Sequence, residues 1–103
     1  MVVTQVLWRE VRAEVLARRG EHAEGERLAR EAVALGDETG MLDMQGDAYA
    51  ARAEVFALAN RPEDSAEALQ QALARYERKE DLVKAGWTRD RLAVLREDAL
   101  IEL

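Results

Sequence analysis

Very few side chains in this 103-residue chain have the chemistry that catalysis requires. His22 is the only histidine, Ser65 is the only serine, and the chain has no cysteine. His22 lies near Glu21 and Glu24, but a metal site or a base built on it would find no cysteine and no second histidine in the sequence. We expect His22 to be a solvated turn residue and Ser65 a small residue that helix packing requires. The inventory predicts a protein that is not an enzyme and that uses no metal or cofactor.

The sequence also lacks the signals of nucleotide, nucleic-acid and membrane binding. No glycine-rich phosphate loop follows a strand, because no segment has the pattern of a strand. A net charge of −6 disfavours binding to duplex nucleic acid or to an anionic membrane surface. The N-terminus lacks the basic region of a signal peptide, and no uncharged run is long enough to span a bilayer. We therefore expect a cytoplasmic protein with no nucleic-acid or membrane partner.

The elements that would position any site come from a repeat at an offset of forty residues. Residues 12–17 read Arg-Ala-Glu-Val-Leu-Ala, and residues 52–57 read Arg-Ala-Glu-Val-Phe-Ala. The match continues with Ala32 and Ala72 at the same offset. Hydrophobic residues make up 49% of the chain but aromatic residues only 5%, so Ala, Leu and Val must form most of the core. A repeated pair of closely packed helices is typical of an α-solenoid.

Apolar residues recur every three or four positions in five segments, which predicts an all-α fold of five antiparallel helices. We place the first helix at about residues 3–19, the second at about 23–35 and the fifth at about 82–100. The third begins near residue 41 or 42 and is followed by a turn at residues 60–64, and the fourth, with Pro62 in its first turn, runs to about residue 78. They form two hairpin units, at about residues 2–40 and 41–80, and a terminal helix at about residues 81–101. All of them belong to a single domain of residues 1–103.

Local signals refine the ends and the buried faces of these helices. Gly20 and Gly36 are expected to end the first two helices, and residues 37–40 to form a turn. Gly46 is expected to lie at a close contact between helices. The buried face of the first helix is predicted to carry Val3, Leu7, Val11 and Val15, with Trp8, Ala13 and Leu16 widening it. That of the fifth is predicted to carry Leu82, Gly86 and Ala93, with Ala85 and Leu92 beside them.

The two hairpin units share a pattern of small and large residues. A small residue late in the first helix precedes a large apolar one, a turn residue and two small residues in the second helix. These are Ala13, Leu16, Gly20, Gly25 and Ala32 in the first unit, and Ala53, Phe56, Asn60, Ser65 and Ala72 in the second. This pattern resembles the tetratricopeptide repeat (TPR) family, most closely at residues 60–69.

Two features depart from the family pattern. The spacing is forty residues instead of the usual period of about 34, and no proline closes either unit. Longer units of this kind resemble the divergent repeats in the C-terminal regions of large bacterial regulators. The resemblance suggests a piece of such a regulator or a small relative of one.

The resemblance implies a concave groove lined by the first helix of each unit. The groove residues that it assigns are mainly acidic: Leu7, Glu10, Glu14, Asp47, Ala50, Glu54 and Asp90. In the chaperone-binding members of the family the corresponding positions are basic and clamp a carboxylate terminus, so that activity is not expected here. An acidic groove predicts a basic or amphipathic helical partner, because opposite charges complement each other. The alternative is that these carboxylates are ordinary solvated residues.

The end of the chain is predicted to expose an apolar surface. The residues that form it are Trp87, Val94, Leu100, Ile101 and Leu103. Large exposed apolar patches usually mark interfaces, so this surface predicts a homodimer or the continuation of a longer array. The alternative is that Trp87 folds back against Tyr76 as part of the core.

These patterns predict a non-enzymatic protein–protein interaction module that binds a peptide, a helix or a neighbouring domain. The alternative is a structural role, either as a self-associating homodimer module or as the terminal fragment of a larger bacterial regulator.

Overall fold

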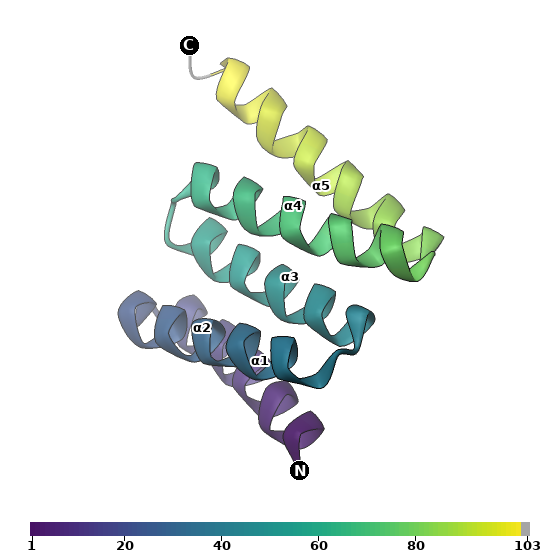
Figure 1. The fold of residues 1–103 in the computed structure, drawn as a ribbon. Helices are drawn as coiled ribbons and strands as arrows, with labels where there is room; N and C mark the ends of the chain where they lie inside the picture. The colour runs from purple at the N-terminus through teal and green to yellow at the C-terminus, as the bar shows by residue number, and fades with distance from the viewer. Residues whose placement is uncertain (102–103) are drawn as a thin grey trace.

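The computed structural model describes residues 1–101, with side chains to residue 98, and it confirms the predicted all-α fold. Five helices follow one another in an antiparallel stack: α1 (Val2–Arg18), α2 (His22–Thr39), α3 (Leu42–Leu58), α4 (Pro62–Lys79) and α5 (Leu82–Ile101) (Figure 1). Leu103 lies outside the described residues, as do the side chains of Leu100 and Ile101. Within residues 1–101, no helix combines the length and apolar content needed to cross a membrane.

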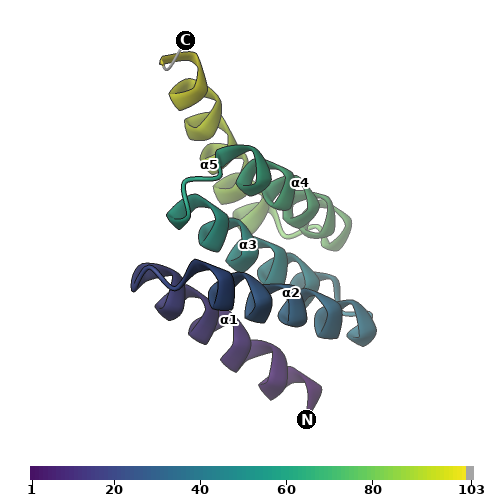
Figure 2. The same ribbon diagram turned by 90° about the vertical axis from the view of Figure 1, so that its left-hand side faces the viewer.

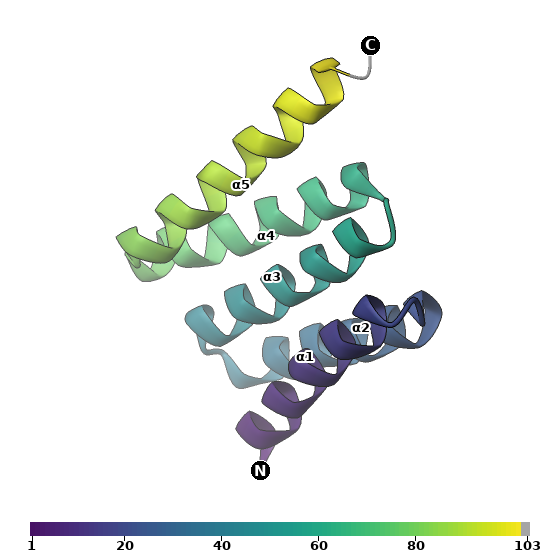
Figure 3. The same cartoon turned by 180° about the vertical axis from the view of Figure 1, so that it is seen from behind.

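The stack has the shape of a slab that measures 45 × 33 × 16 Å. The first helices of the successive units, α1, α3 and α5, face the viewer in Figure 3, and α2 and α4 lie behind them. Each hairpin buries its own core, and α3 also packs against both helices of the first hairpin. The layer of α1, α3 and α5 therefore forms one continuous face.

Small side chains let the two helices of each hairpin approach closely. A Cβ atom at Gly46 would lie 2.5 Å from Cε1 of Tyr76, so α4 fits against α3 only because position 46 has no side chain. The buried Ser65 hydroxyl donates a hydrogen bond to the Ala53 carbonyl oxygen at 2.8 Å, across the same hairpin. Both the close contact expected at Gly46 and the packing role expected of Ser65 are confirmed.

In α1 and α3, one stripe of residues makes the contacts with the second helix of the hairpin. Helix α5 has a stripe at the same positions. Its positions follow a spacing of four, three, four and three residues, which keeps them on one side of a helix. They are Val2, Val6, Arg9, Ala13 and Leu16 in α1; Leu42, Gly46, Tyr49, Ala53 and Phe56 in α3; and Leu82, Gly86, Arg89, Ala93 and Arg96 in α5. We call each set a hairpin stripe. Helix α2 covers the stripe of α1 and α4 covers that of α3.

The predicted end of the second helix is wrong. Helix α2 continues through Gly36 to Thr39 and ends at Gly40, whose φ of +70° is left-handed. Gly36 stays helical because it is buried against α3, where a Cβ would lie 3.7 Å from Cβ of Ala48. The predicted turn at residues 37–40 is thus mostly helix, whereas Gly20, at φ +83°, ends α1 as expected. His22 is the first residue of α2 and not a turn residue.

The predicted buried face of the first helix is only partly right. Ala13 and Leu16 are buried as expected, but Val3, Leu7, Trp8 and Val11 are exposed. Leu7 is 50% exposed and Val11 65% exposed, while Val6 and Ala13 are fully buried. Two neighbouring stripes on this helix have the helical spacing, and α2 covers the one that contains Val6 and Ala13. The small Ala13 permits the close contact with α2, where a Cβ at Gly25 would lie 2.9 Å from the Ala13 carbonyl oxygen. The larger residues Leu7 and Val11 are left on the side that no other helix among residues 1–101 covers.

Helix α5 shows a related difference. Ala85 and Leu92 are buried against α4 as expected, but Leu82 is 79% exposed and Ala93 is exposed as well. Leu82 and Ala93 belong to the hairpin stripe, which a second helix covers in the other two units. Among the described residues no helix covers it in α5.

Candidate protein-binding groove

A cavity of about 560 Å³ lies between α1 and α3. These are two of the helices that face the viewer in Figure 3. Four of its lining side chains are carboxylates and one is a cation: Glu10, Val11, Glu14, Arg18, Asp47, Ala50, Ala51 and Glu54. Five of the groove residues predicted from the sequence are therefore brought together here. The other two, Leu7 and Asp90, are exposed on α1 and α5 and do not line it.

A second cavity, of about 270 Å³, continues from α3 to α5. Asp47, Ala50 and Glu54 line both cavities, so α3 forms the floor that joins them. The α5 side is contributed by Lys84, Trp87, Thr88 and Arg91. We refer to the two cavities together as the groove.

Glu10 is the carboxylate with the least favourable surroundings. Its Oε1 atom is buried and has no hydrogen-bond partner. Burial, together with the nearby charges of Asp47 and Glu14, raises the pKa of Glu10 to about 7, although the charge of Lys84 opposes the shift. This carboxylate is therefore partly protonated around neutral pH, because the chain compensates its negative charge poorly.

Glu14 lies one helical turn further along α1 and faces a similar environment. Burial and the charge of Glu54 raise the pKa of Glu14, and the charge of Arg18 acts against the shift. Arg18 lies 3.9 Å from Glu54, at the limit of an ion pair, and its side chain is largely exposed. Such an exposed ion pair contributes little free energy. The positive charge of Arg18 therefore compensates the negative charge of the carboxylates only partly.

Asp47 is the groove carboxylate whose negative charge is balanced by a partner within the chain. Both of its oxygens accept hydrogen bonds from the Lys84 ammonium, at 3.0 and 3.1 Å. The Tyr76 hydroxyl donates a third, at 2.6 Å, and burial and this bond raise the pKa of Tyr76 above its usual value. Asp47 therefore links α3 to α4 and α5 and fixes the centre of the groove.

Sequence reasoning missed several residues of this site, among them Val11, Arg18 and Lys84. Val11 aligns with Ala51 at the forty-residue offset, and both line the groove, so the repeat contains a signal for Val11. Arg18 and Lys84 have no such signal, because the residues aligned with them, Leu58 and Met44, are uncharged.

The residues considered for catalysis lie elsewhere. His22 has a buried Nδ1 atom without a hydrogen-bond partner, but it does not line the groove. The Ser65 hydroxyl is committed to the Ala53 carbonyl. Among the side chains that the structure describes, no three His, Asp or Glu residues are grouped as a metal site requires.

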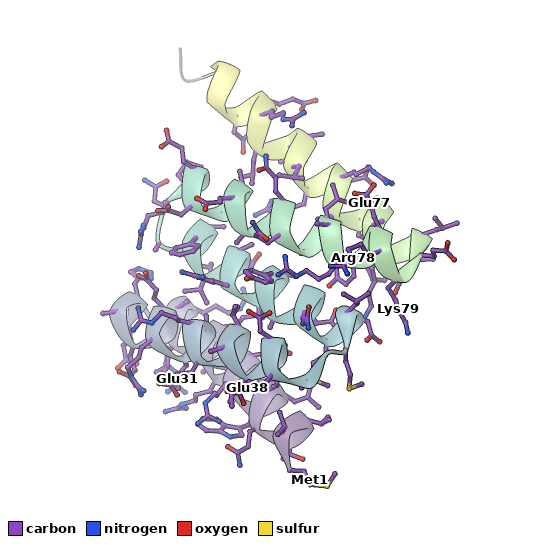
Figure 4. All side chains as sticks on the ribbon, in the orientation of Figure 1. Met1, Glu31, Glu38, Glu77, Arg78 and Lys79 are labelled. Carbon is purple, nitrogen blue, oxygen red and sulfur yellow. The ribbon has the colours of Figure 1, made fainter. Side chains whose placement is uncertain are left out.

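The opposite face of the slab differs from the groove in its charge pattern. Figure 4 shows side chains of both signs there, including Glu31, Glu38, Glu77, Arg78 and Lys79 on α2 and α4. Several of the acidic residues on this face have a cationic partner; for example, Glu77 accepts a hydrogen bond from Arg89 at 2.7 Å. The cluster of four carboxylates with one cation therefore belongs to the cavity between α1 and α3, whereas the α5 side of the groove adds the cations Lys84 and Arg91.

Trp87 marks the α5 end of the groove. Its side chain is 66% exposed, so it is not part of the core, and Val94 is 42% exposed. The alternative in which Trp87 packs as core against Tyr76 is therefore wrong.

Comparison of the chain with protein-family models, with curated proteins and with solved structures finds no match.

Proposed function

We propose that the protein is a non-enzymatic interaction module whose groove binds a basic, amphipathic helical segment of another protein. The observation that carries this proposal is the charge of the cavity between α1 and α3, which is lined by four carboxylates and one cation. Removing carboxylates from water is unfavourable unless positive charges compensate them. Lysine or arginine side chains of a partner would supply that compensation at Glu10 and Glu14.

The apolar residues of the groove favour an amphipathic partner over a simple polycation. Val11 lines the groove on the α1 side and Trp87 lines it on the α5 side. A helix with basic residues on one side and apolar residues on the other could form ion pairs with the carboxylates and pack against these two apolar side chains. Exposed aromatic residues of this kind often contribute strongly to binding.

Fluorescence anisotropy with a designed helical peptide tests the proposal. The peptide carries lysines on one face and leucines on the other, and a control peptide replaces the lysines with glutamates. We expect the lysine peptide to bind and the control not to bind, and a variant with Glu14→Lys and Glu54→Lys to bind the lysine peptide at least about tenfold more weakly.

A matched variant separates the groove from the overall charge. Glu38→Lys and Glu63→Lys change the net charge by the same amount at two exposed positions outside the groove. This variant should bind the lysine peptide nearly as well as the unmodified protein. Equal affinity of both double variants would rule out the groove as the binding surface.

The exposure of Trp87 and Val94 favours a second candidate function, self-association as a homodimer. Light scattering over a concentration series measures the mass in solution, and Trp87→Glu should convert a dimer into a monomer. A dimer that persists in this variant would exclude the Trp87 surface as the dimer interface.

The resemblance of the repeat units to those of large bacterial regulators stays a prediction.

A further inference from the structure

The hairpin stripe of α5 is an interface without its second helix among residues 1–101. In α3 the equivalent stripe is filled: Tyr76 lies over Gly46, and Ser65 bonds to the carbonyl of Ala53. In α5, a Cβ at Gly86 would meet no atom within 4 Å, and Leu82 is 79% exposed. The same stripe therefore makes close contacts in one unit and faces open space in another.

The charge of this stripe indicates what kind of helix fits it. In the first unit, Arg9 of the stripe pairs with Glu31 of the covering helix, with Nε 3.0 Å from Oε1. Arg89 occupies the position equivalent to Arg9, and Arg96 lies two turns of the helix from Arg89. Both arginines are exposed, and the α5 stripe contains no acidic residue. A covering helix with a carboxylate opposite Arg89 would reproduce the Arg9–Glu31 pair.

The existing contact of Arg89 leaves room for such a pair. Arg89 donates a hydrogen bond to Glu77 of α4, but about half of each side chain is exposed. An ion pair this exposed contributes little to stability, so Arg89 can turn toward a second carboxylate at small cost.

We infer that the hairpin stripe of α5 is a docking surface for one acidic amphipathic helix of a partner protein, which packs on α5 as α4 packs on α3. The helix places a large side chain over Gly86, as Tyr76 lies over Gly46, and a carboxylate against Arg89, as Glu31 lies against Arg9. The surface does not include the groove carboxylates, so this inference is independent of the proposed function.

A second copy of the chain fits this stripe less well. In a two-fold antiparallel pairing centred on the stripe, Arg89 of each copy would lie near Arg89 of the other, because position 89 is the middle of the five. Like charges placed opposite one another disfavour the complex. The stripe is thus better matched to an acidic helix than to itself.

A peptide built from the chain's own α4 provides the probe. The acidic probe has the sequence of residues 62–79 with Gln71→Glu and Arg75→Leu, because positions 71 and 75 are equivalent to Glu31 and Leu35 at the forty-residue offset. The second change is needed because Arg75 lies over Tyr49 in the chain and would otherwise face Arg89, the residue equivalent to Tyr49. It therefore carries Tyr76 for Gly86 and a carboxylate for Arg89. The control peptide has Gln71→Lys instead, also with Arg75→Leu, and is called the basic control for the lysine at this one position. Titration of each labelled peptide with the whole protein, followed by fluorescence anisotropy, gives the affinities.

We expect the acidic probe to bind and Gly86→Leu to weaken its binding at least about tenfold, because a leucine fills the space that the tyrosine requires. Arg89→Glu should weaken binding of the acidic probe and strengthen binding of the basic control. Glu14→Lys, in the groove, should leave the affinity for the acidic probe unchanged. Circular dichroism checks that Gly86→Leu remains folded, as its open surroundings predict.

Three results would overturn the inference. The first is that neither peptide binds, and the second is that Gly86→Leu and Arg89→Glu bind both peptides like the unmodified protein. The third is that light scattering finds a dimer which Gly86→Leu converts into a monomer, since a second copy would then occupy the stripe. Failure of the groove proposal would change none of these measurements.

Discussion

At the scale of single residues, Glu10 couples the stability of the fold to pH. Its pKa is raised from 4.5 to about 7, so the folded chain binds more protons than the unfolded chain between these values. The stabilisation that this difference provides is complete below about pH 4.5, and it is lost as the pH rises through about 7.

Substitution Glu10→Gln removes this dependence. We expect the variant to match the unmodified protein at pH 4 and to be more stable at pH 8, by about 1 kcal/mol or roughly 4–8 °C in Tm after allowance for solvent screening. Thermal unfolding followed by circular dichroism at both pH values measures the difference. The same difference at pH 4 and pH 8 would contradict the role assigned to burial of Glu10.

Gly46 and Gly86 form a matched pair that separates packing from helix propensity. Alanine at Gly46 would clash with Tyr76, whereas alanine at Gly86 meets open space. We expect Gly46→Ala to lower the free energy of unfolding by about 1–3 kcal/mol. Gly86→Ala should raise it by about 0.5–1 kcal/mol, because alanine favours a helix over glycine. Urea denaturation compares the two, and a similar effect at both positions would contradict the described contact.

At the scale of the helices, the sequence predicts which segments are helical better than it predicts their ends and faces. All five helices lie where periodicity places them. The end of α2 could not be predicted from Gly36, because a glycine can end a helix or permit a close contact within one. The buried face of α1 could be predicted only in part: Ala13 and Leu16 are buried as expected, but side-chain size does not show that Leu7 and Val11 face away from α2.

Helix α5 is supported on one side only by the described residues. It packs against α4, and Ala93, Val94 and residues 96–98 are all exposed. Figure 2 shows its C-terminal end extending beyond the rest of the stack. Helix α3, in contrast, packs against α1, α2 and α4.

Amide hydrogen exchange followed by mass spectrometry should detect this difference. We expect amides of α5 beyond Leu92 to exchange roughly tenfold faster or more than those in the middle of α3, because few contacts must break for α5 to open. Equal protection of the two segments would contradict one-sided support. The acidic helix inferred above should slow exchange in α5 when it binds.

At the scale of the whole molecule, the repeat explains how much of the groove could be predicted. First helices of successive units lie side by side, so residues forty apart reach the same face. This places Glu10, Glu14, Asp47 and Glu54 together. The compensation of Asp47 by Lys84 and Tyr76 could not be predicted, because it depends on how α5 and α4 pack on α3, and the repeat has no equivalent of this contact.

The left-handed residue that follows each hairpin has a further consequence. Gly40 and Glu80 occupy the same place in their units, at φ values of +70° and +64°, and each precedes a first helix by two residues. A deletion or duplication of forty residues between them would rejoin the chain at the same backbone conformation and present matching helix faces at the junction. Length can therefore change in whole hairpins during evolution without disturbing the joint, and the groove would lengthen or shorten by one helix at each step.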